Sequence, residues 1–362
     1  MEKMPKWADA TLVPLISLLL AAILSALVIL AIGEDPVAAL KLMVEGALMR
    51  SSGWGYTLYY ATNFIFTGLA VSVAFHARLF NIGGEGQAML AGLGVALCCL
   101  YIPWPHWSLA LLGSSLFAGL FGAAWALIPA YLQAKRGSHI VITTIMFNYI
   151  AFSVLGYMLV NVLRPPRAME PASAKFSAAT NLPTFEDMFS TAAAPMFKSA
   201  PVNVSFFVAL AACVFVYFLI WRTRLGYEIR HFGFSETAAN YAGTSAVRIT
   251  VIAMLISGAL AGLMAVNTTQ GEAERLILNS TEGAGFIGIA VALMGRNHPL
   301  GIVLASLLFG ILYQGGAELA FEVPTITREL VVVIQGLVIL FSGALAYMST
   351  PWVEWVYRKC VR

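Results

Sequence analysis

The sequence predicts an all-α polytopic membrane protein of about ten transmembrane helices, and two observations carry this prediction. Of the 362 residues, 60% are hydrophobic and 11% are charged, and the mean hydropathy is +0.82. Ordinary soluble domains carry roughly 25% charged residues, so this composition excludes a soluble fold. The apolar residues also gather in runs that can cross a hydrocarbon core of about 30 Å, which takes about 20 helical residues. We therefore treat residues 1–362 as a single transmembrane domain.

Ten apolar runs of membrane-crossing length follow one another along the chain, at residues 12–32, 57–76, 86–102, 108–132, 139–163, 203–221, 247–266, 284–295, 300–316 and 329–348. The first follows "MEKMPKWADA", which has no small-x-small cleavage site, so we expect a retained span rather than a signal peptide. The eighth run is too short to cross alone. We expect it to be broken or buried inside the bundle, where irregular backbone is tolerated.

The basic residues predict the orientation of these spans. With the N-terminus inside, thirteen Lys and Arg residues fall in inner segments and eight in outer ones. This bias predicts that both termini are cytoplasmic. It also assigns two hydrophilic segments, an extracytoplasmic loop over 164–201 that is rich in Pro, Ala, Ser and Thr, and a cytoplasmic segment over 222–248.

The charges and cysteines exclude two classes of partner. The net charge is +3 and the basic residues are scattered through loops, so we expect no nucleic-acid partner. Cys98, Cys99 and Cys213 lie in apolar runs and Cys360 lies in the tail. No pair has the spacing of a metal site, so we expect no metal and no disulfide framework.

The stretch "LFNIGGEGQAML" (79–90) places polar residues and glycines at the start of an apolar run. Glycines alone are explained by close helix packing. Glu85 adds a carboxylate, which at membrane depth usually faces the bundle interior or an aqueous cavity. The alternative is that Glu85 lies at the inner interface beside Arg78 as a simple cap. A phosphate-binding loop is excluded, because no Lys-Ser/Thr follows and no strand precedes.

A second glycine-containing segment repeats this pattern. "EGQAMLAGLGVAL" (85–97) resembles "EGAGFIGIAVAL" (282–293), which lies five spans later and therefore in the opposite orientation. Glycine-interrupted segments at matching positions of two inverted halves mark a transporter's binding site. We therefore expect inverted internal repeats, with 81–97 and 282–295 approaching each other near the bundle centre. The alternative is a chance likeness between Gly/Ala-rich membrane segments.

The cytoplasmic stretch "HFGFSETAANYAGTSAVR" has the pattern of a short helix. Ser235 is a suitable N-cap, Glu236 suits the first turn, and Gly243 is a natural stop. Its alanines predict a small-residue face that docks into a partner's groove, as would suit a transporter driven by a separate soluble motor. The alternative is an ordinary connecting loop. The candidate coupling residues are Gly233, Ser235, Glu236, Ala238, Ala239, Tyr241 and Gly243.

These motifs together resemble the permease subunits of ATP-binding-cassette importers of the sugar and nucleoside branch, most of all the nucleoside type linked to basic membrane proteins. The resemblance covers nearly the whole chain and rests on "GLAVSVAFHARLFNIGGEGQ", "VITTIMFNYIA", "AANYAG" with "SGALAGLMA", and "GFIGIAVALMGRNHPLGIVLASLLFG". It implies a bacterial cell (inner) membrane subunit with no ATP site of its own. The implied partners are a second related permease, an ATPase with two cassettes and an extracytoplasmic substrate-binding protein. The segment around "AANYAG" would be the coupling helix.

The function that follows is a non-enzymatic permease that imports nucleosides or related sugars without a cofactor of its own, ATP being bound by the partner ATPase. The sequence has no nucleophile–base set and no Walker motif. Hydrogen bonds and aromatic stacking would guide the substrate. The candidate pathway residues are Phe80, Asn81, Glu85 and Gln87 on the third span, Thr143, Thr144 and Asn148 on the fifth, and Tyr60, Asn63 and Phe64 on the second. For those of the fifth span, bonding to neighbouring helices is the alternative.

Two rival functions stay open at this stage. An ion-coupled secondary transporter would need buried acids or histidines in several spans, and only Glu85 is a firm candidate. A membrane scaffold without a transport path would leave the glycine-rich segments as packing alone. The sequence also does not separate nucleosides from free sugars, because both need neutral polar recognition.

Overall fold

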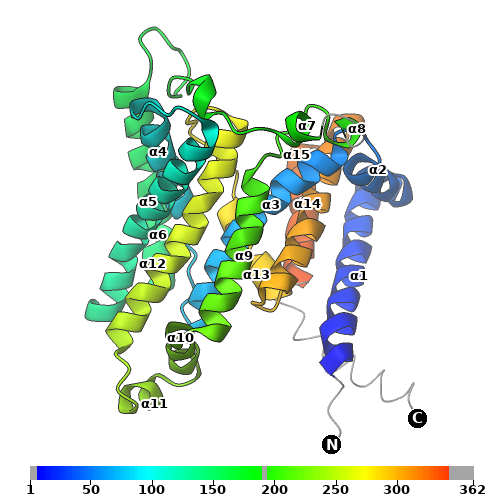
Figure 1. Ribbon diagram of the computed structural model, residues 1–362. Coiled ribbons are helices and arrows are strands. Elements are labelled where there is room, and N and C mark those ends of the chain that lie inside the picture. Colours follow the sequence, from blue (N-terminus) through cyan, green and yellow to red (C-terminus); the bar gives the residue numbers. More distant parts are fainter. Residues whose placement is uncertain (1–5, 190–193, 342–362) are drawn as a thin grey trace, which may run out of the picture.

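The computed structural model describes residues 6–189 and 194–341, and their regular secondary structure is helical (Figure 1). The longer helices are α1 (Lys6–Ile32), α2 (Pro36–Leu48), α3 (Gly53–His76), α4 (Gly84–Tyr101), α5 (Trp107–Arg136), α6 (Ile140–Met158), α9 (Ser205–Arg222), α10 (Arg224–Phe234), α12 (Ala246–Ala265), α13 (Ala284–Met294), α14 (Pro299–Glu322) and α15 (Arg328–Ile339). Shorter elements are η1 (Leu159–Leu163), η2 (Ala178–Thr180), α7 (Phe185–Met188), α8 (Ala194–Phe197), α11 (Glu236–Tyr241) and η3 (Val266–Glu272).

The described residues contain seven helices that are long and apolar enough to cross a membrane, or eight if the bent pair α1–α2 is one span. The chain is therefore a multi-pass membrane protein. Each of the ten predicted runs holds a helix, but ten complete spans are not established. The eighth run forms α13, which at 11 residues is too short to cross alone, as predicted. The tenth extends beyond residue 341, outside the described residues.

Helix α2 is a helix that the sequence analysis did not predict, because its 13 residues are too few for a span. It begins where Asp35 accepts a hydrogen bond from the backbone N–H of Val37, with Pro36 in the first helical position. It meets α1 at a bend of 116°. At its far end Arg50 forms ion pairs with Glu318 and Glu322 of α14. The hydrogen bond that Arg50 donates to Glu322 raises the pKa of Arg50 above its ordinary value.

The bundle is held together by helices that approach closely at small residues. Helix α3 and helix α4 are largely buried, whereas α5 and α6 expose most of their length. Between α5 and α12, a Cβ on Gly122 would lie 2.2 Å from the carbonyl oxygen of Gly258. No side chain larger than hydrogen fits there, which is the usual reason for glycine at membrane helix contacts.

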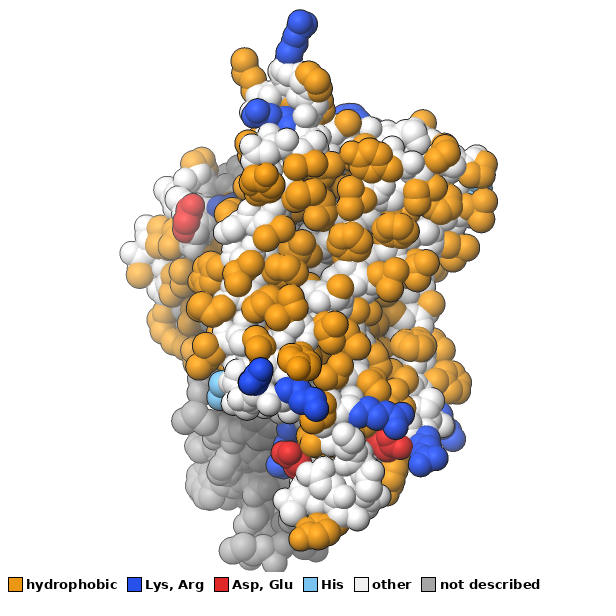
Figure 2. Space-filling view, turned by 90° about the vertical axis from the view of Figure 1, so that its left-hand side faces the viewer, with side chains coloured by type: hydrophobic (Ala, Val, Ile, Leu, Met, Phe, Trp, Pro, Cys, Tyr) orange, Lys and Arg blue, Asp and Glu red, His pale blue; other side chains and the backbone are white. Residues whose placement is uncertain are grey.

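The outer face of α5 and α6 has the pattern of a surface in lipid. Figure 2 shows apolar side chains over this face and Lys and Arg side chains along its lower edge. Exposed apolar residues on α5 include Leu112, Leu116 and Leu120. The lower edge is the end of the molecule that carries α10 and α11 (Figures 1 and 2).

The described parts of the hydrophilic segment, 164–189 and 194–201, lie at the opposite end, with α7 and α8 beside the upper end of α3 (Figure 1). It is attached to the bundle by backbone contacts: the N–H of Ser173 donates to the carbonyl of Leu276 at 2.9 Å, and Thr184 forms an isolated bridge with Asn203. Helix α1 begins at the same end as α10 and α11.

Candidate transport pathway and coupling segment

Helices α4 and α13 meet at their N-termini inside the bundle. The carboxylate of Glu85, which is 4% exposed, accepts hydrogen bonds from the hydroxyl of Thr281 at 2.5 Å and from the backbone N–H groups of Gly283 at 3.0 Å and Gly285 at 2.8 Å. The N–H groups of a first helical turn have no partner within their helix and carry partial positive charge, so a carboxylate stabilises them. Glu85 therefore caps α13 from a distant part of the chain.

This contact confirms that segments 81–97 and 282–295 approach each other, each starting its helix at the glycines. A Cβ on Gly285 would lie 2.3 Å from the backbone nitrogen of Glu85, so the two backbones touch. Glu85 does act as a cap, but the groups that it caps belong to α13 and the loop before it. The inverted repeat itself stays a prediction.

Asn81 and Gln87 do not line an open cavity but bond to each other across the start of α4. The amide of Asn81 donates to Gln87 Oε1 at 3.0 Å and to the hydroxyl of Ser257 at 2.8 Å, while its oxygen accepts from the N–H of Gly83 at 2.9 Å. Ser257 in turn donates to the carbonyl of Ala70 at 2.6 Å. This network fixes the loop between α3 and α4 against α12.

The polar residues of α6 bond to helix backbones, in agreement with the alternative considered for them. Asn148 donates to the carbonyl of Ile82 at 3.0 Å and accepts from the N–H of Gly86 at 2.9 Å, and so joins α6 to the start of α4. Thr143 and Thr144 donate to carbonyls one turn earlier in α6, at 2.8 Å each.

Aromatic side chains form a group on α3 and α14. Only its members on α3, Tyr60 and Phe64, were predicted from the sequence. Tyr60 and Phe64 of α3 contact Tyr313 of α14 with ring centroids 5.7 and 5.0 Å apart, and Phe309 lies 6.4 Å from Phe64. Phe64 and Phe309 are buried, whereas Tyr60 and Tyr313 are partly exposed. Phe80 lies apart from this group and contacts Phe75, with ring centroids 6.0 Å apart.

An ion pair stands near this aromatic group. Arg328 at the start of α15 lies 3.5 Å from Glu282, which directly precedes α13, and both side chains are more than half exposed. Neither was a candidate site residue, because nothing in the sequence connects residue 282 with residue 328.

A second polar network surrounds η3, where α12 continues as a π-helix. Asn267 donates to Asn63 Oδ1 at 2.8 Å and accepts from Asn203 at 3.0 Å and from Ser205 at 2.8 Å. Tyr59 donates to Glu272 in the same element. The predicted pathway residue Asn63 is therefore buried and bonded to neighbouring helices. π-Helical turns are frequent at functional sites, but their presence is not readable from sequence periodicity.

The coupling segment forms the predicted short helix, α11, outside the bundle at the end that carries the basic edge (Figures 1 and 2). The hydroxyl of Ser235 accepts from the N–H of Ala238 at 3.3 Å, and Gly243 has a φ of +84°, so the N-cap and the stop are confirmed. It is preceded by α10, an amphipathic helix that was not predicted. Tyr241 and Glu236 are exposed.

The prediction that the alanines of α11 form one face towards a partner is wrong. Ala239 has no exposed surface and packs on the bundle of its own chain, whereas Ala238 and Ala242 are exposed. Gly233 is also buried, and it packs so closely on α3 that a Cβ there would lie 2.0 Å from the carbonyl oxygen of His76. Ala239 and Gly233 therefore hold the segment to the membrane bundle, and the exposed side chains of α11 are the ones available to a partner.

The described residues contain no group of three His, Cys, Asp or Glu side chains that could hold a metal ion. Cys98, Cys99 and Cys213 are buried free thiols, and Cys360 lies outside the described residues.

The chain is similar to known transport proteins over most of its length. Residues 54–343 match the family described as branched-chain amino acid transport system, permease component. The chain is 35% identical to a glucose ABC transporter permease of Haloferax volcanii, covering 91% of this chain and 86% of the relative. It is 33% identical to a guanosine ABC transporter permease of Bacillus subtilis, covering 94% of this chain and 95% of the relative. No solved structure gives a significant match.

A third relative is a nucleoside ABC transporter permease of Lactococcus lactis, 31% identical over 91% of this chain and 90% of the relative. The family match spans the bundle from α3 to α15, and so includes the α4–α13 contact and the coupling segment. The chain belongs to this family of ABC transporter permeases, whose members are transport subunits and not enzymes.

Proposed function

We propose that the chain is the permease subunit of an ATP-driven importer for nucleosides or related sugars. The observation that carries this proposal is the meeting of the starts of α4 and the short helix α13 inside the bundle, joined by Glu85. Transporters place their substrate path where discontinuous helices start within the membrane, because the local backbone there can open and close. We call this contact, in which Glu85 at the start of α4 bonds to Thr281, Gly283 and Gly285 at the start of α13, the joint. A scaffold protein has no need of it.

The proposed path runs past the aromatic group and the ion pair towards this joint. Tyr60 and Tyr313 would stack on an apolar ring face of the substrate, and the Glu282–Arg328 pair would supply hydrogen bonds to its hydroxyl groups. The contact between Glu85 and α13 would be the part that changes during transport. The relatives named above carry glucose and nucleosides by name, so both substrate classes are retained.

The proposed energy source is a two-cassette ATPase that docks on α11 in the cytoplasm. The proposal includes a second related permease, an extracytoplasmic substrate-binding protein, a bacterial cell membrane and both termini in the cytoplasm. Movement of α11 would reach the joint through few residues: Gly233 contacts the carbonyl of His76, and the loop that follows His76 leads directly to Asn81 and Glu85.

The test is transport by the assembled complex in proteoliposomes. The chain is purified with the second permease and the ATPase encoded beside it, loaded binding protein is added, and uptake of labelled guanosine and glucose is measured. We expect uptake with ATP and none with a non-hydrolysable ATP analogue. Uptake that continues without ATP and stops when an uncoupler removes the proton gradient would contradict the proposal and favour an ion-coupled transporter.

A further inference from the structure

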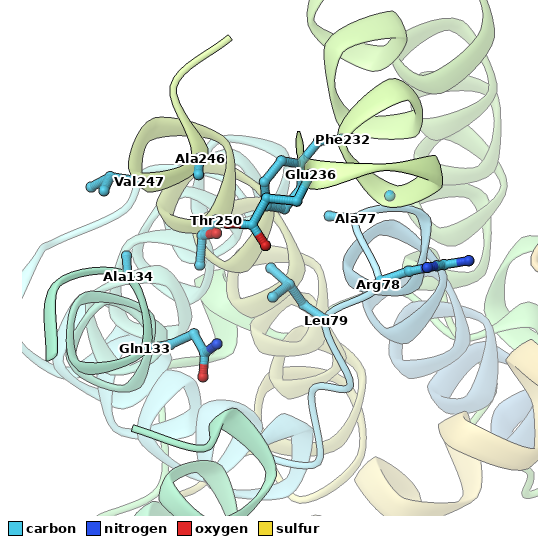
Figure 3. A pocket seen from close by; sticks show the side chains of 11 residues that line it. Ala77, Arg78, Leu79, Gln133, Ala134, Phe232, Glu236, Ala246, Val247 and Thr250 are labelled. Atoms are coloured by element: carbon cyan, nitrogen blue, oxygen red, sulfur yellow. The ribbon is translucent and has the colours of Figure 1, made fainter. Parts of the chain in front are cut away.

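A cavity of about 270 Å³ separates the coupling segment from the membrane bundle (Figure 3). Its wall on one side is formed by Phe232, Gly233 and Glu236 of α10 and α11. The opposite wall comes from the loop after α3, the end of α5 and the start of α12. The lining residues there are Ala77, Arg78, Leu79, Gln133, Ala134, Ala246, Val247 and Thr250.

Two side chains that line this cavity, Gln133 and Glu236, have acceptor oxygens without a donor in the described part of the chain. Gln133 Oε1 is buried and has no hydrogen-bond partner among the described residues. The carboxylate of Glu236 extends from α11 across the cavity towards Thr250 (Figure 3). Within the described part of the chain Glu236 forms no ion pair, whereas Glu228, on the preceding helix α10, is paired with Arg224 at 3.2 Å. Glu236 is exposed to solvent, but a buried acceptor without a partner costs roughly 1–3 kcal/mol, so the Gln133 oxygen calls for a donor.

The positive charge of Arg78 does not meet this need. Arg78 contributes to the wall, but its guanidinium points away from Glu236 and out of the cavity (Figure 3). The cavity is therefore lined by a carboxylate, a side-chain amide and a hydroxyl, with no positive charge directed at them. A group with several N–H donors and a positive charge, an ammonium or a guanidinium, is the chemistry that satisfies all three.

The size and place of the cavity indicate a protein side chain as its occupant rather than a free molecule. Pockets for drug-sized ligands measure roughly 300–1,000 Å³, and this cavity is smaller. It lies directly behind the α10–α11 segment, which exposes two large aromatic side chains, Phe234 at the end of α10 at 78% and Tyr241 at the end of α11 at 90%. Exposed aromatic residues of this kind are typical anchors of protein interfaces.

We propose that the ATPase subunit inserts a lysine or arginine side chain into this cavity, between the coupling helix and the bundle, and pairs it with Glu236 and Gln133. This inference rests on the proposed function, since it supposes that an ATPase docks on α11. With this side chain behind α11 and the ATPase surface in front of it, the ATPase would contact α11 on both sides. A movement of the ATPase would then move the coupling segment with it. Because the pair would be shielded from water, its loss should weaken docking markedly.

The test measures the affinity of the purified ATPase for the permease pair in nanodiscs, at low and at high salt. Glu236→Gln keeps the size of the side chain and removes its charge, and we expect affinity to fall about tenfold and its salt dependence to shrink. Gln133→Glu adds a second carboxylate, and we expect tighter binding with a steeper salt dependence. Glu228→Gln is the matched control, the same change at a paired acid outside the cavity, and should bind as the unaltered pair does.

The outcomes separate this inference from the function on which it rests. An unaltered permease pair that binds no ATPase contradicts the proposed function. An ATPase that binds the unaltered, Glu236→Gln and Gln133→Glu pairs equally overturns the inference and leaves the function standing. A free amine as occupant would also overturn it. In that case spermidine would raise the melting temperature of the unaltered pair but not of Glu236→Gln, while ATPase affinity would be the same for both.

Discussion

Glu85 Oε2 lies 2.8 Å from the backbone nitrogen of Gly285, and this hydrogen bond joins residues 200 positions apart in the sequence. The same carboxylate accepts from Thr281 and from Gly283, so it has no free side within the joint. A carboxylate bonded in this way is poorly suited to carry an ion or a proton across the membrane. It is well suited to hold two helix starts together in one state of a transport cycle.

The first prediction concerns this carboxylate. Glu85→Ala removes the acceptor and leaves the N–H groups of Gly283 and Gly285 buried without a partner, at a cost of roughly 1–3 kcal/mol each. We expect uptake to fall strongly while the two permeases still assemble. Glu85→Gln retains one carbonyl oxygen and should be milder. Uptake by the reconstituted complex and size-exclusion profiles check this. Assembly lost in step with uptake would indicate a purely structural role.

The second prediction separates the glycines of the joint from a glycine elsewhere. A Cβ on Gly86 would lie 2.9 Å from Asn148 Oδ1, whereas a Cβ on Gly119 of α5 would meet nothing closer than Ala259 at 3.8 Å. Gly86→Leu should therefore lower the melting temperature and uptake, and Gly119→Leu should have a smaller effect on both. Gly283 has open space around it but a φ of +81°, so its replacement is expected to cost about 1–2 kcal/mol through backbone strain. Equal effects at Gly86 and Gly119 would contradict the close packing of α4 on α6.

The position of the joint could be predicted from the sequence, because its glycines and Glu85 recur in a second segment. The residues that contact Tyr60, Phe64 and Glu282 could not be predicted from the sequence. Tyr313 and Arg328 lie in or beside apolar runs whose periodicity does not reveal which helix they face, and their contacts with α3 and Glu282 depend on the packing of the whole bundle. The partner of Asn63 could not be predicted for the same reason, since Asn267 comes from a π-helical turn.

The alanines of the coupling segment show a different limit. Ala238 and Ala242 are four residues apart and share one helix face, whereas Ala239 is turned by about 100° from Ala238. The sequence therefore contained two faces where one was expected. Which face packs on the bundle is decided by α10, a helix that was not predicted because its 11 residues are only partly apolar.

The third prediction follows from this division of the alanines. Ala239→Trp places an indole where no surface is exposed, and should lower the yield and the melting temperature of the permease itself. Ala238→Trp places the same ring on the exposed side and should leave the permease folded. We expect the second variant to lose stimulation of ATPase activity by loaded binding protein. Normal stimulation in Ala238→Trp would show that the partner does not contact this side of α11.

The fourth prediction tests the aromatic group. Tyr60→Ala removes a partly exposed ring that contacts Tyr313, and should raise the KM for uptake of guanosine about tenfold if stacking guides the substrate. Tyr60→Phe keeps the ring and should stay near the unaltered value. Phe117→Ala is the control, because Phe117 stacks on Phe121 within α5, away from the proposed path. A KM that changes equally in the Tyr60→Ala and Phe117→Ala variants would argue against substrate contact.

The last prediction concerns the connection between the coupling segment and the joint. Gly233 lies against the end of α3, and a Cβ there would come within 2.0 Å of the carbonyl oxygen of His76 and 3.3 Å of Ala77 Cα. Gly233→Ala must therefore move α10 away from α3, while α11 keeps its own cap at Ser235 and its exposed surface. We expect the ATPase to bind this variant and to hydrolyse ATP, but without stimulation by loaded binding protein and with little uptake, because the loop that leads to Asn81 and Glu85 no longer follows the coupling helix. Gly243→Ala is the control: it has a φ of +84° and no neighbouring atom within 4 Å, so it strains the end of α11 without touching α3. A Gly233→Ala complex with normal stimulated ATPase activity and normal uptake would show that the movement enters the bundle elsewhere, through α9 or α12, the two helices to which the segment is directly connected.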